Sequence, residues 1–184
     1  MTPPPTLGSA GKTSSGAAAN AEAVCREWYE SHGAAVYNYF RFHVADTDAA
    51  EDLTAETFLH VVRAIDRFDP DKGSPKTWIL TVARNVLMDW RRRARLRQYV
   101  PIGTLHDLAV EAPSPEERLL REEEVARLMN GIAALSAADR ELIGLRYGSE
   151  LDTAEMAAVL GIREGAVRSR LWRAMSRLRE ELTS

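Results

Sequence analysis

Five side chains near the carboxyl end of the chain could recognise a nucleic acid. Apolar residues recur at helical spacing between positions 164 and 182, which predicts a helix with one inward stripe. The outward or marginal residues of that helix are Arg168, Ser169, Trp172, Arg173 and Arg177. Arginine can form two parallel hydrogen bonds with guanine or pair with a phosphate, and serine can bond to either. The pattern therefore predicts a surface that reads base edges and contacts the sugar-phosphate backbone.

A helix-turn-helix would position these side chains. Such a motif needs a small residue where its helices cross, a turn residue that tolerates positive φ, and an apolar anchor in the second helix. Ala157, Gly161 and Val167 stand at suitable spacing for these three tasks. The remaining apolar positions of the predicted motif would fill its core: Met156, Leu160, Ile162, Leu171, Ala174 and Leu178.

The same basic residues have a simpler explanation as the solvated face of an ordinary helical hairpin. Trp172 argues against it, because an exposed indole usually has a binding partner. That indole could instead pack against Tyr147 or Met175. Arg163, in the turn before the second helix, is a further candidate for a phosphate contact.

A second basic surface is predicted near the middle of the chain. Trp78–Arg97 has the periodicity of a helix, and its second half holds Arg91, Arg92, Arg93, Arg95 and Arg97. Cations favour the carboxyl end of a helix, but that preference explains one or two arginines and not five. A phosphate-binding surface is the better interpretation, and it predicts a steep dependence of binding on salt.

An aromatic loop precedes this basic helix. Phe68 is followed by the loop Asp69–Ser74, and Asn85 lies within the helix. An aromatic ring, a loop and an amide beside a basic helix could hold unstacked bases. On these residues alone, a core phenylalanine and a capping asparagine would be the default interpretation.

A cluster of carboxylates marks a helix expected to run from the cap at Asp46 to about Asp66. Asp46, Asp48, Glu51, Asp52 and Glu56 have no basic residue close by in the sequence. Acidic residues stabilise a helix amino terminus, which accounts for the first two better than for the last two. A docking face for a basic protein partner is the alternative that covers them all.

The composition is that of a soluble globular protein. The 184 residues are 45% hydrophobic and carry a net charge of -3, so neither sign of charge is in large excess. The basic and acidic residues gather in separate stretches of the chain. Cys25 is the only cysteine, and no apolar run approaches the ~20 residues of a membrane span. We therefore expect a cytoplasmic protein without membrane insertion. None of the four histidines has metal-site or catalytic-triad spacing, and no phosphate-binding loop motif is present, so no metal, cofactor or catalytic residue is predicted.

These patterns predict an all-α chain with two small helical domains joined by a flexible acidic linker, the second domain being a helix-turn-helix. No strand pattern is present. Residues 1–20 are expected to be a disordered tail, residues 21–97 the first domain, residues 98–114 the linker and residues 115–184 the second domain. Helices are expected at about 21–44, 47–66, 75–97, 115–135, 137–147, 153–160 and 164–182. Predicted helix caps are Asp46, Ser74 with Pro75, Ser136, and Asp152 with Glu155.

In this order, the motifs resemble the extracytoplasmic-function (ECF) group of the sigma-70 family of RNA polymerase sigma factors. The resemblance extends from about Ala21 to Leu182. Residues 50–58 resemble the polymerase-binding segment, residues 64–68 and 77–85 resemble the promoter-melting and minus-ten segments, and residues 135–174 hold three motifs of the minus-thirty-five domain. The chain departs from the usual family pattern at Ala55, Pro75, Arg163 and Ala166.

The resemblance implies a role for each matched position. The polymerase-binding positions would be Glu51, Asp52, Leu53, Glu56 and Phe58. The minus-ten positions would be Phe68, Ser74, Trp78, Arg84, Asn85, Arg91, Arg92 and Arg93. The minus-thirty-five positions would be Arg163, Arg168, Ser169, Trp172, Arg173 and Arg177.

The resemblance also implies the partners and the activity. The chain would bind the clamp and flap regions of core RNA polymerase and promoter DNA, would start transcription as an alternative sigma factor, and would be held by an anti-sigma factor. A stand-alone helix-turn-helix regulator is the alternative, and two other classes of protein suit the sequence less well. An enzyme is disfavoured by the lack of a catalytic constellation. A pure interaction protein, such as an anti-sigma antagonist, would not need two basic surfaces.

Overall fold

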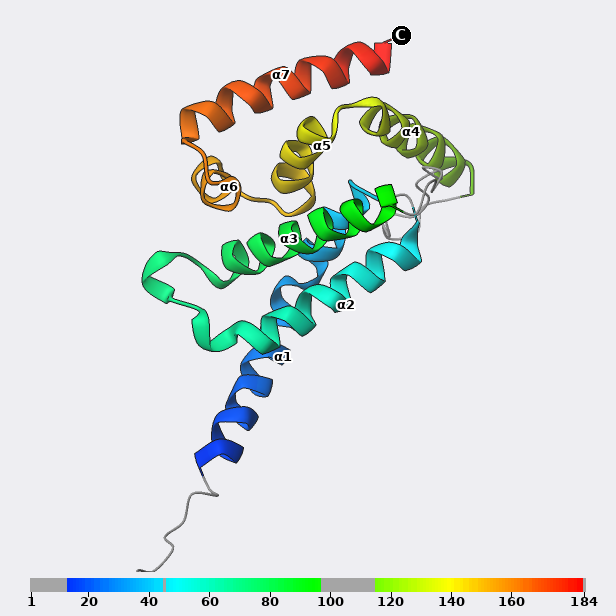
Figure 1. Ribbon diagram of the computed structural model, residues 1–184. Coiled ribbons are helices and arrows are strands. Elements are labelled where there is room, and N and C mark those ends of the chain that lie inside the picture. The colour runs from blue at the N-terminus through cyan, green and yellow to red at the C-terminus, as the bar shows by residue number, and fades with distance from the viewer. Residues whose placement is uncertain (1–12, 45, 97–114, 184) are drawn as a thin grey trace, which may run out of the picture.

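The computed structural model describes residues 13–44, 46–96 and 115–183, and within these ranges every regular element is a helix or helical turn (Figure 1). This confirms the all-α prediction. The helices are α1 (Thr13–Arg41), α2 (Thr47–Ala64), α3 (Pro75–Leu96), α4 (Pro115–Ala134), α5 (Ala137–Ile143), α6 (Thr153–Leu160) and α7 (Glu164–Thr183). Three short turns join them: η1 (Ile65–Arg67), η2 (Pro70–Lys72) and the π-helical turn η3 (Gly144–Gly148).

The helices begin at the predicted caps. The Asp46 carboxylate accepts the backbone N–H of Asp48 at 3.1 Å at the start of α2. Ser74 accepts the N–H of Thr77 at 3.2 Å, directly before Pro75 opens α3. The Asp152 carboxylate and the Glu155 side chain form a reciprocal capping box at the start of α6, as expected.

The first helix begins earlier than expected. We expected helical structure from Ala21, but α1 starts at Thr13, within the segment predicted to be a disordered tail. Three consecutive alanines, at positions 17–19, have high helix propensity and extend α1 toward its amino end. The rest of the expected tail, residues 1–12, and the expected linker, residues 98–114, lie outside the described residues.

The buried face of α3 is wider than a single apolar stripe. Trp78, Val82, Val86 and Trp90 recur every four residues, but of these only Val86 is buried and the other three are partly buried. The fully buried positions are Ile79, Leu80, Ala83 and Leu87. Helix α3 packs against α1 and α2 on one side and against α6 on the other, so apolar residues surround more of it than a surface helix would need (Figure 1).

The carboxyl-terminal helices form the predicted helix-turn-helix. Helix α6 ends at Gly161, whose φ of 66° is left-handed, and α7 follows at Glu164. Val167, Ala174 and Leu178 are buried on the inner face of α7, and Leu171 packs at the edge of the core. One boundary differs: α5 ends at Ile143, and the residues up to Gly148 form the wider turn η3 in place of the expected helix to Tyr147.

The two helical regions pack against each other through a shared core. One buried cluster contains Phe40 of α1 and Leu80 of α3. The same cluster contains Leu145 of η3, Leu151 just before α6, and Met156 within α6. The carboxyl end of α1 lies against η3, while the amino-terminal turns of α1 extend away from the other helices (Figure 1). The surfaces predicted to bind DNA must therefore be considered in this packed arrangement.

Candidate functional site

The outer face of α7 exposes four of the side chains that the sequence predicted to lie outward, Arg168, Ser169, Trp172 and Arg173. Arg168, Ser169, Trp172 and Arg173 line one shallow hollow. The Trp172 side chain is 72% exposed, so the alternative that it packs against Tyr147 or Met175 is wrong. Arg168 forms an exposed ion pair with Glu164 one turn earlier, which leaves its guanidinium accessible to a ligand. An accessible indole between two guanidinium groups can contact both the apolar and the charged parts of a nucleic acid.

The other two predicted positions of this surface differ from each other. Arg163 is exposed in the turn before α7. Arg177 instead reaches Asp139 of α5, with its Nη1 2.6 Å from Oδ2 of a carboxylate that is only 9% exposed. The Ser136 hydroxyl donates to the same oxygen at 2.8 Å. Arg177 therefore anchors α7 on α5, a structural contact that its place on the outward stripe did not indicate.

The arginines of α3 are engaged by carboxylates and by a histidine. Nε of Arg84 lies 2.7 Å from Oε1 of Glu141 on α5, and Nη2 of Arg91 lies 3.0 Å from Nδ1 of His43. Arg92 pairs with Asp89 at 2.6 Å on the exposed side of the same helix. The placement of the Arg95 and Arg97 side chains lies outside the described residues. Arg84 in particular faces a protein carboxylate in this arrangement.

Phe68 belongs to an aromatic cluster beneath the loop. Its ring centroid lies 5.0 Å from that of Trp28 and 5.6 Å from that of Trp78, with edge-on or tilted geometry. Ser74 is occupied as the cap of α3. Asn85 is exposed on α3 and caps no helix. Phe68 is thus a core residue, as the default interpretation had it. Asn85 is not a helix cap, and its amide is accessible on the basic helix.

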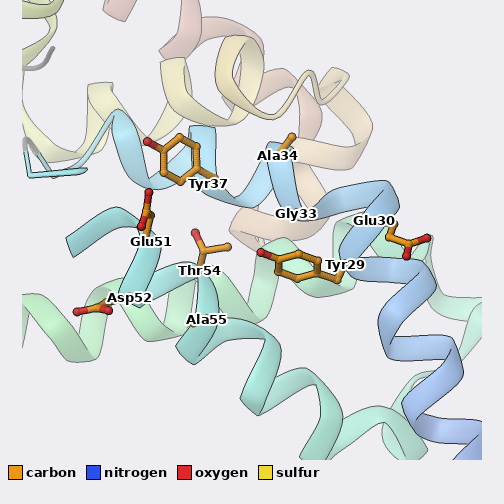
Figure 2. Close-up of a pocket in the computed structure, with 9 residues that line it drawn as sticks. All are labelled: Tyr29, Glu30, Gly33, Ala34, Tyr37, Glu51, Asp52, Thr54 and Ala55. Atoms are coloured by element: carbon orange, nitrogen blue, oxygen red, sulfur yellow. The ribbon is translucent and has the colours of Figure 1, made fainter. Parts of the chain in front are cut away.

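The predicted acidic face forms one wall of a groove between α1 and α2 (Figure 2). Its volume is about 730 Å³. Helix α2 contributes Glu51 and Asp52, and α1 contributes Glu30 together with the rings of Tyr29 and Tyr37. Three carboxylates and no basic side chain line this groove, so its charge suits a basic partner.

The remaining predicted polymerase-binding positions lie below or beside the groove. Leu53 and Phe58 are buried, and Phe58 packs edge-on against Tyr29 with ring centroids 4.8 Å apart. Glu56 has no basic residue close by in the sequence, but the fold brings one to it. Its carboxylate receives Nη2 of Arg93 at 3.0 Å, from a position 37 residues later in the chain.

The α1 wall of the groove was not predicted from the sequence. Tyr29, Gly33 and Tyr37 recur every four residues and therefore share one face of α1. That spacing is a weaker signal than the apolar residues Trp28, Val36 and Tyr39, which recur on the buried side of the same helix. The acidic groove consequently combines a predicted wall with an unpredicted one.

Burial changes the ionisation of two groups where α1 approaches η3. The pKa of Tyr39 is raised above its ordinary value, chiefly by burial and also by the Glu141 carboxylate. The pKa of His43 is well below its ordinary value because its ring is desolvated and because Arg91 and Arg140 are nearby cations. His43 is therefore neutral at physiological pH.

The residues that the structure describes hold neither a group of metal ligands nor a membrane-spanning helix. No three histidine, cysteine, aspartate or glutamate side chains in residues 13–44, 46–96 and 115–183 are grouped so that they could hold a metal ion. Among the helices that the structure describes, none is both long and apolar enough to cross a bilayer.

Comparison with known families assigns both helical regions. Residues 28–97 match sigma-70 region 2, and residues 123–178 match sigma-70 region 4. The chain is 35% identical over 171 residues to the ECF RNA polymerase sigma factor SigL of Mycobacterium tuberculosis, which covers 90% of this chain and 92% of that protein. This chain belongs to the ECF sigma factors.

A second relative agrees with this membership, and a solved structure shows the same fold. The ECF sigma factor BldN of Streptomyces coelicolor is 34% identical over 150 residues, which is 82% of this sigma factor and 57% of BldN. The structure of the sigma factor RpoE in complex with the anti-sigma factor NepR from Bartonella quintana matches with a TM-score of 0.68 at 24% identity, over 86% of this chain and 95% of RpoE, which shows a shared fold. An alternative sigma factor is therefore the correct functional class, and the stand-alone helix-turn-helix regulator is not.

Proposed function

We propose that this sigma factor uses α7 to read the minus-thirty-five element, α3 and the loop before it to bind the minus-ten element, and the acidic groove to dock on core RNA polymerase. The observation that carries the proposal is the exposed indole of Trp172, which lines one hollow with Arg168 and Arg173 on the outer face of α7. Burying that large apolar side chain against DNA would remove it from water. No packing role within the described residues accounts for its position.

In region 4, the exposed Arg163, Arg168, Ser169 and Arg173 would contact the major groove and its phosphates beside Trp172. Region 4 would also meet the flap of the polymerase. Ser169 donates its hydroxyl to the Gly165 carbonyl at 2.9 Å, so it would turn or share that hydroxyl to bond to DNA.

In region 2, the accessible side chains of α3 would contact the minus-ten DNA. Asn85 and Arg92 are exposed and could do so directly. Arg84 and Arg91 would add phosphate contacts once released from Glu141 and His43. Phe68 would have to leave the Trp28 and Trp78 rings to hold an extruded base, while Ser74 and Trp78 would shape the loop.

The groove between α1 and α2 would receive a basic helical segment of the polymerase clamp. Glu51, Asp52 and Glu30 supply the complementary charge, and Tyr29 and Tyr37 supply apolar area and hydroxyl groups (Figure 2). Leu53 and Phe58 would support the groove from below, and the Glu56–Arg93 pair would fix α3 beside it. Charge complementarity of this kind raises the association rate and sets orientation.

Control by an anti-sigma factor completes the proposal. RpoE, which shares this fold, was solved with its anti-sigma factor NepR, and a partner that covers the α1–α2 groove would compete directly with polymerase. This sigma factor would act in the cytoplasm, would need no cofactor, and would catalyse no reaction itself, because polymerase performs the nucleotide chemistry.

Run-off transcription with purified core polymerase on genomic fragments tests this function. We expect promoter-specific products that depend on the added chain. Trp172→Ala should abolish most of the product from promoters that need the minus-thirty-five element, and a Glu51→Gln, Asp52→Asn double variant should weaken binding to core polymerase. Arg179→Ala, an exposed change near the end of α7, is the matched control. Tight binding of the free chain to a palindromic site, with no effect on polymerase, would contradict the proposal.

A further inference from the structure

We propose that the packed arrangement is a self-latched state, in which Glu141 of region 4 occupies Arg84 of region 2 and the Phe42 ring locks into a glycine notch in η3. This inference rests on the proposed function, because it concerns how the two DNA-binding regions are kept from their sites. Core polymerase would open the latch by binding the region 2 groove and region 4 separately.

The first component of the latch is electrostatic. The Glu141 carboxylate, 11% exposed, faces the Arg84 guanidinium at 2.7 Å across the boundary between α5 and α3. A carboxylate and a phosphate present similar anionic oxygens to arginine. Glu141 therefore takes the place that a DNA phosphate would need, so that the closed chain and a promoter compete for the same guanidinium.

The second component is steric. A side-chain methyl group at Gly148 would lie 2.8 Å from Cε2 and 2.9 Å from Cδ2 of Phe42, and 3.2 Å from the Asn38 carbonyl oxygen. The same group at Gly144 would lie 3.1 Å from Cβ of Phe42. These two glycines, four residues apart in η3, therefore form a notch for a ring at the end of α1. An added methyl group would force the ring to shift at Gly148 and would make a tight contact with it at Gly144.

A hydrogen bond and a shared core reinforce these contacts. The Ser149 hydroxyl donates to the Ala35 carbonyl of α1 at 2.9 Å, and Ser149 is fully buried. Leu145 and Leu151 join the buried cluster that holds Phe40. The closed state therefore has a specific interface and not only an incidental contact between two regions.

The closed state cannot contact both promoter elements. Their names place the centres of the two elements about 25 base pairs apart, which is about 85 Å of duplex at ~3.4 Å per base pair. A compact chain of this length has a radius of gyration of about 16 Å, and hence a diameter of about 40 Å. Both elements can therefore be contacted together only if the two regions separate, which is the opening that we assign to core polymerase.

Small-angle scattering and DNA binding of the full-length chain test the latch. Glu141→Gln keeps the shape of the side chain and removes its charge. We expect its radius of gyration to rise by about a quarter or more as the regions separate. Its affinity for a single-stranded minus-ten oligonucleotide should rise about fivefold or more, with a salt slope steeper by about 0.7 for one regained phosphate contact. Glu150→Gln removes a charge from an exposed site nearby and should change neither quantity.

Two other variants separate the components. Gly148→Ala should expand the chain without altering any charge, whereas Gly165→Ala, where a methyl group meets no atom within 4 Å, should not. Arg84→Gln should also expand the chain but should not gain DNA affinity, because the phosphate contact itself is lost. Circular dichroism checks that each variant keeps its helices. If Gly148→Ala unfolds, the scattering and DNA binding of Glu141→Gln alone test the latch.

The outcomes distinguish the latch from the function. If the wild-type chain is already extended, or if Glu141→Gln scatters and binds DNA like wild type, the latch is overturned even when transcription is promoter-specific. If the variants expand as expected but core polymerase makes no promoter-specific product with any of them, the latch stands as a conformational fact and the proposed function fails.

Discussion

Arg177 on α7 and Asp139 on α5 form an ion pair that joins the two helices, with Nη1 2.6 Å from Oδ2. Asp139 also accepts from Ser136, which caps α5. One carboxylate thus links the start of α5 to the middle of α7. Trp172 and Arg177 both belong to α7, so the orientation of the Trp172 surface depends on this link.

We therefore expect Arg177→Ala to destabilise region 4. The variant leaves a buried carboxylate without its cation, and because Arg177 is itself half exposed we expect a loss of about 1–2 kcal/mol in the free energy of unfolding. Urea denaturation followed by circular dichroism measures it. Arg173→Ala, on the exposed face of the same helix, should stay within about 0.5 kcal/mol of wild type. Equal losses for the two variants would show that Asp139 does not depend on Arg177.

Trp172→Ala should weaken DNA binding without lowering stability, unlike Arg177→Ala. Because the indole is 72% exposed, its removal should leave the free energy of unfolding within about 0.5 kcal/mol of wild type. Binding of the polymerase holoenzyme to promoter DNA should weaken by about tenfold or more, since the contact with the minus-thirty-five element is lost. Fluorescence anisotropy with labelled promoter fragments reports this change. Unchanged affinity together with a lower stability would mean that Trp172 is a packing residue after all.

Local chemistry explains why the sequence predicted the fold well. Each cap at Asp46, Ser74 and Asp152 acts within three residues of itself, so a short stretch of sequence contains all the information that the helix start requires. The helix-turn-helix is likewise a local motif, set by Gly161 and Val167. The early start of α1 was missed because its polar and small residues resemble a tail, although its alanines favour a helix.

Long-range pairing explains what the sequence did not predict. Arg84 and Glu141 are 57 positions apart, and Arg177 and Asp139 are 38 apart. An arginine on an outward stripe looks the same whether it meets solvent, DNA or a distant carboxylate, so composition and periodicity cannot separate these cases. Hence the exposed part of the α7 surface was predicted correctly, whereas the anchoring role of Arg177 required the tertiary structure.

The turn of the helix-turn-helix should tolerate no residue but glycine without strain. Gly161 has a φ of 66°, and Gly161→Ala should cost about 1 kcal/mol in the free energy of unfolding although a methyl group there meets no other atom. Gly165→Ala provides the matched control, because it lies in open space within α7 and should stabilise the chain by about 0.5 kcal/mol. Thermal or urea unfolding of both variants checks this; a stabilising Gly161→Ala would contradict the left-handed turn.

The buried ring of His43 should make stability fall as the pH falls. Its pKa in the folded chain is well below 6.5 because of burial and the cations Arg91 and Arg140, whereas the unfolded chain has the ordinary value. The unfolded state therefore binds a proton first, so the contribution of His43 to stability is present above about pH 6.5 and is lost progressively below it, at up to about 1.4 kcal/mol per pH unit.

His43→Asn tests this sign directly. The variant should be less stable than wild type at pH 7.5, where it loses packing against Tyr39, but its stability should fall less steeply between pH 6.5 and about pH 5. Some slope will persist because burial and Lys76 also lower the pKa of His32. Chemical denaturation at several pH values gives the two curves. Parallel curves for the variant and wild type would show that His43 is protonated alike in the folded and unfolded chains, and that the boundary between α1 and η3 is open to water.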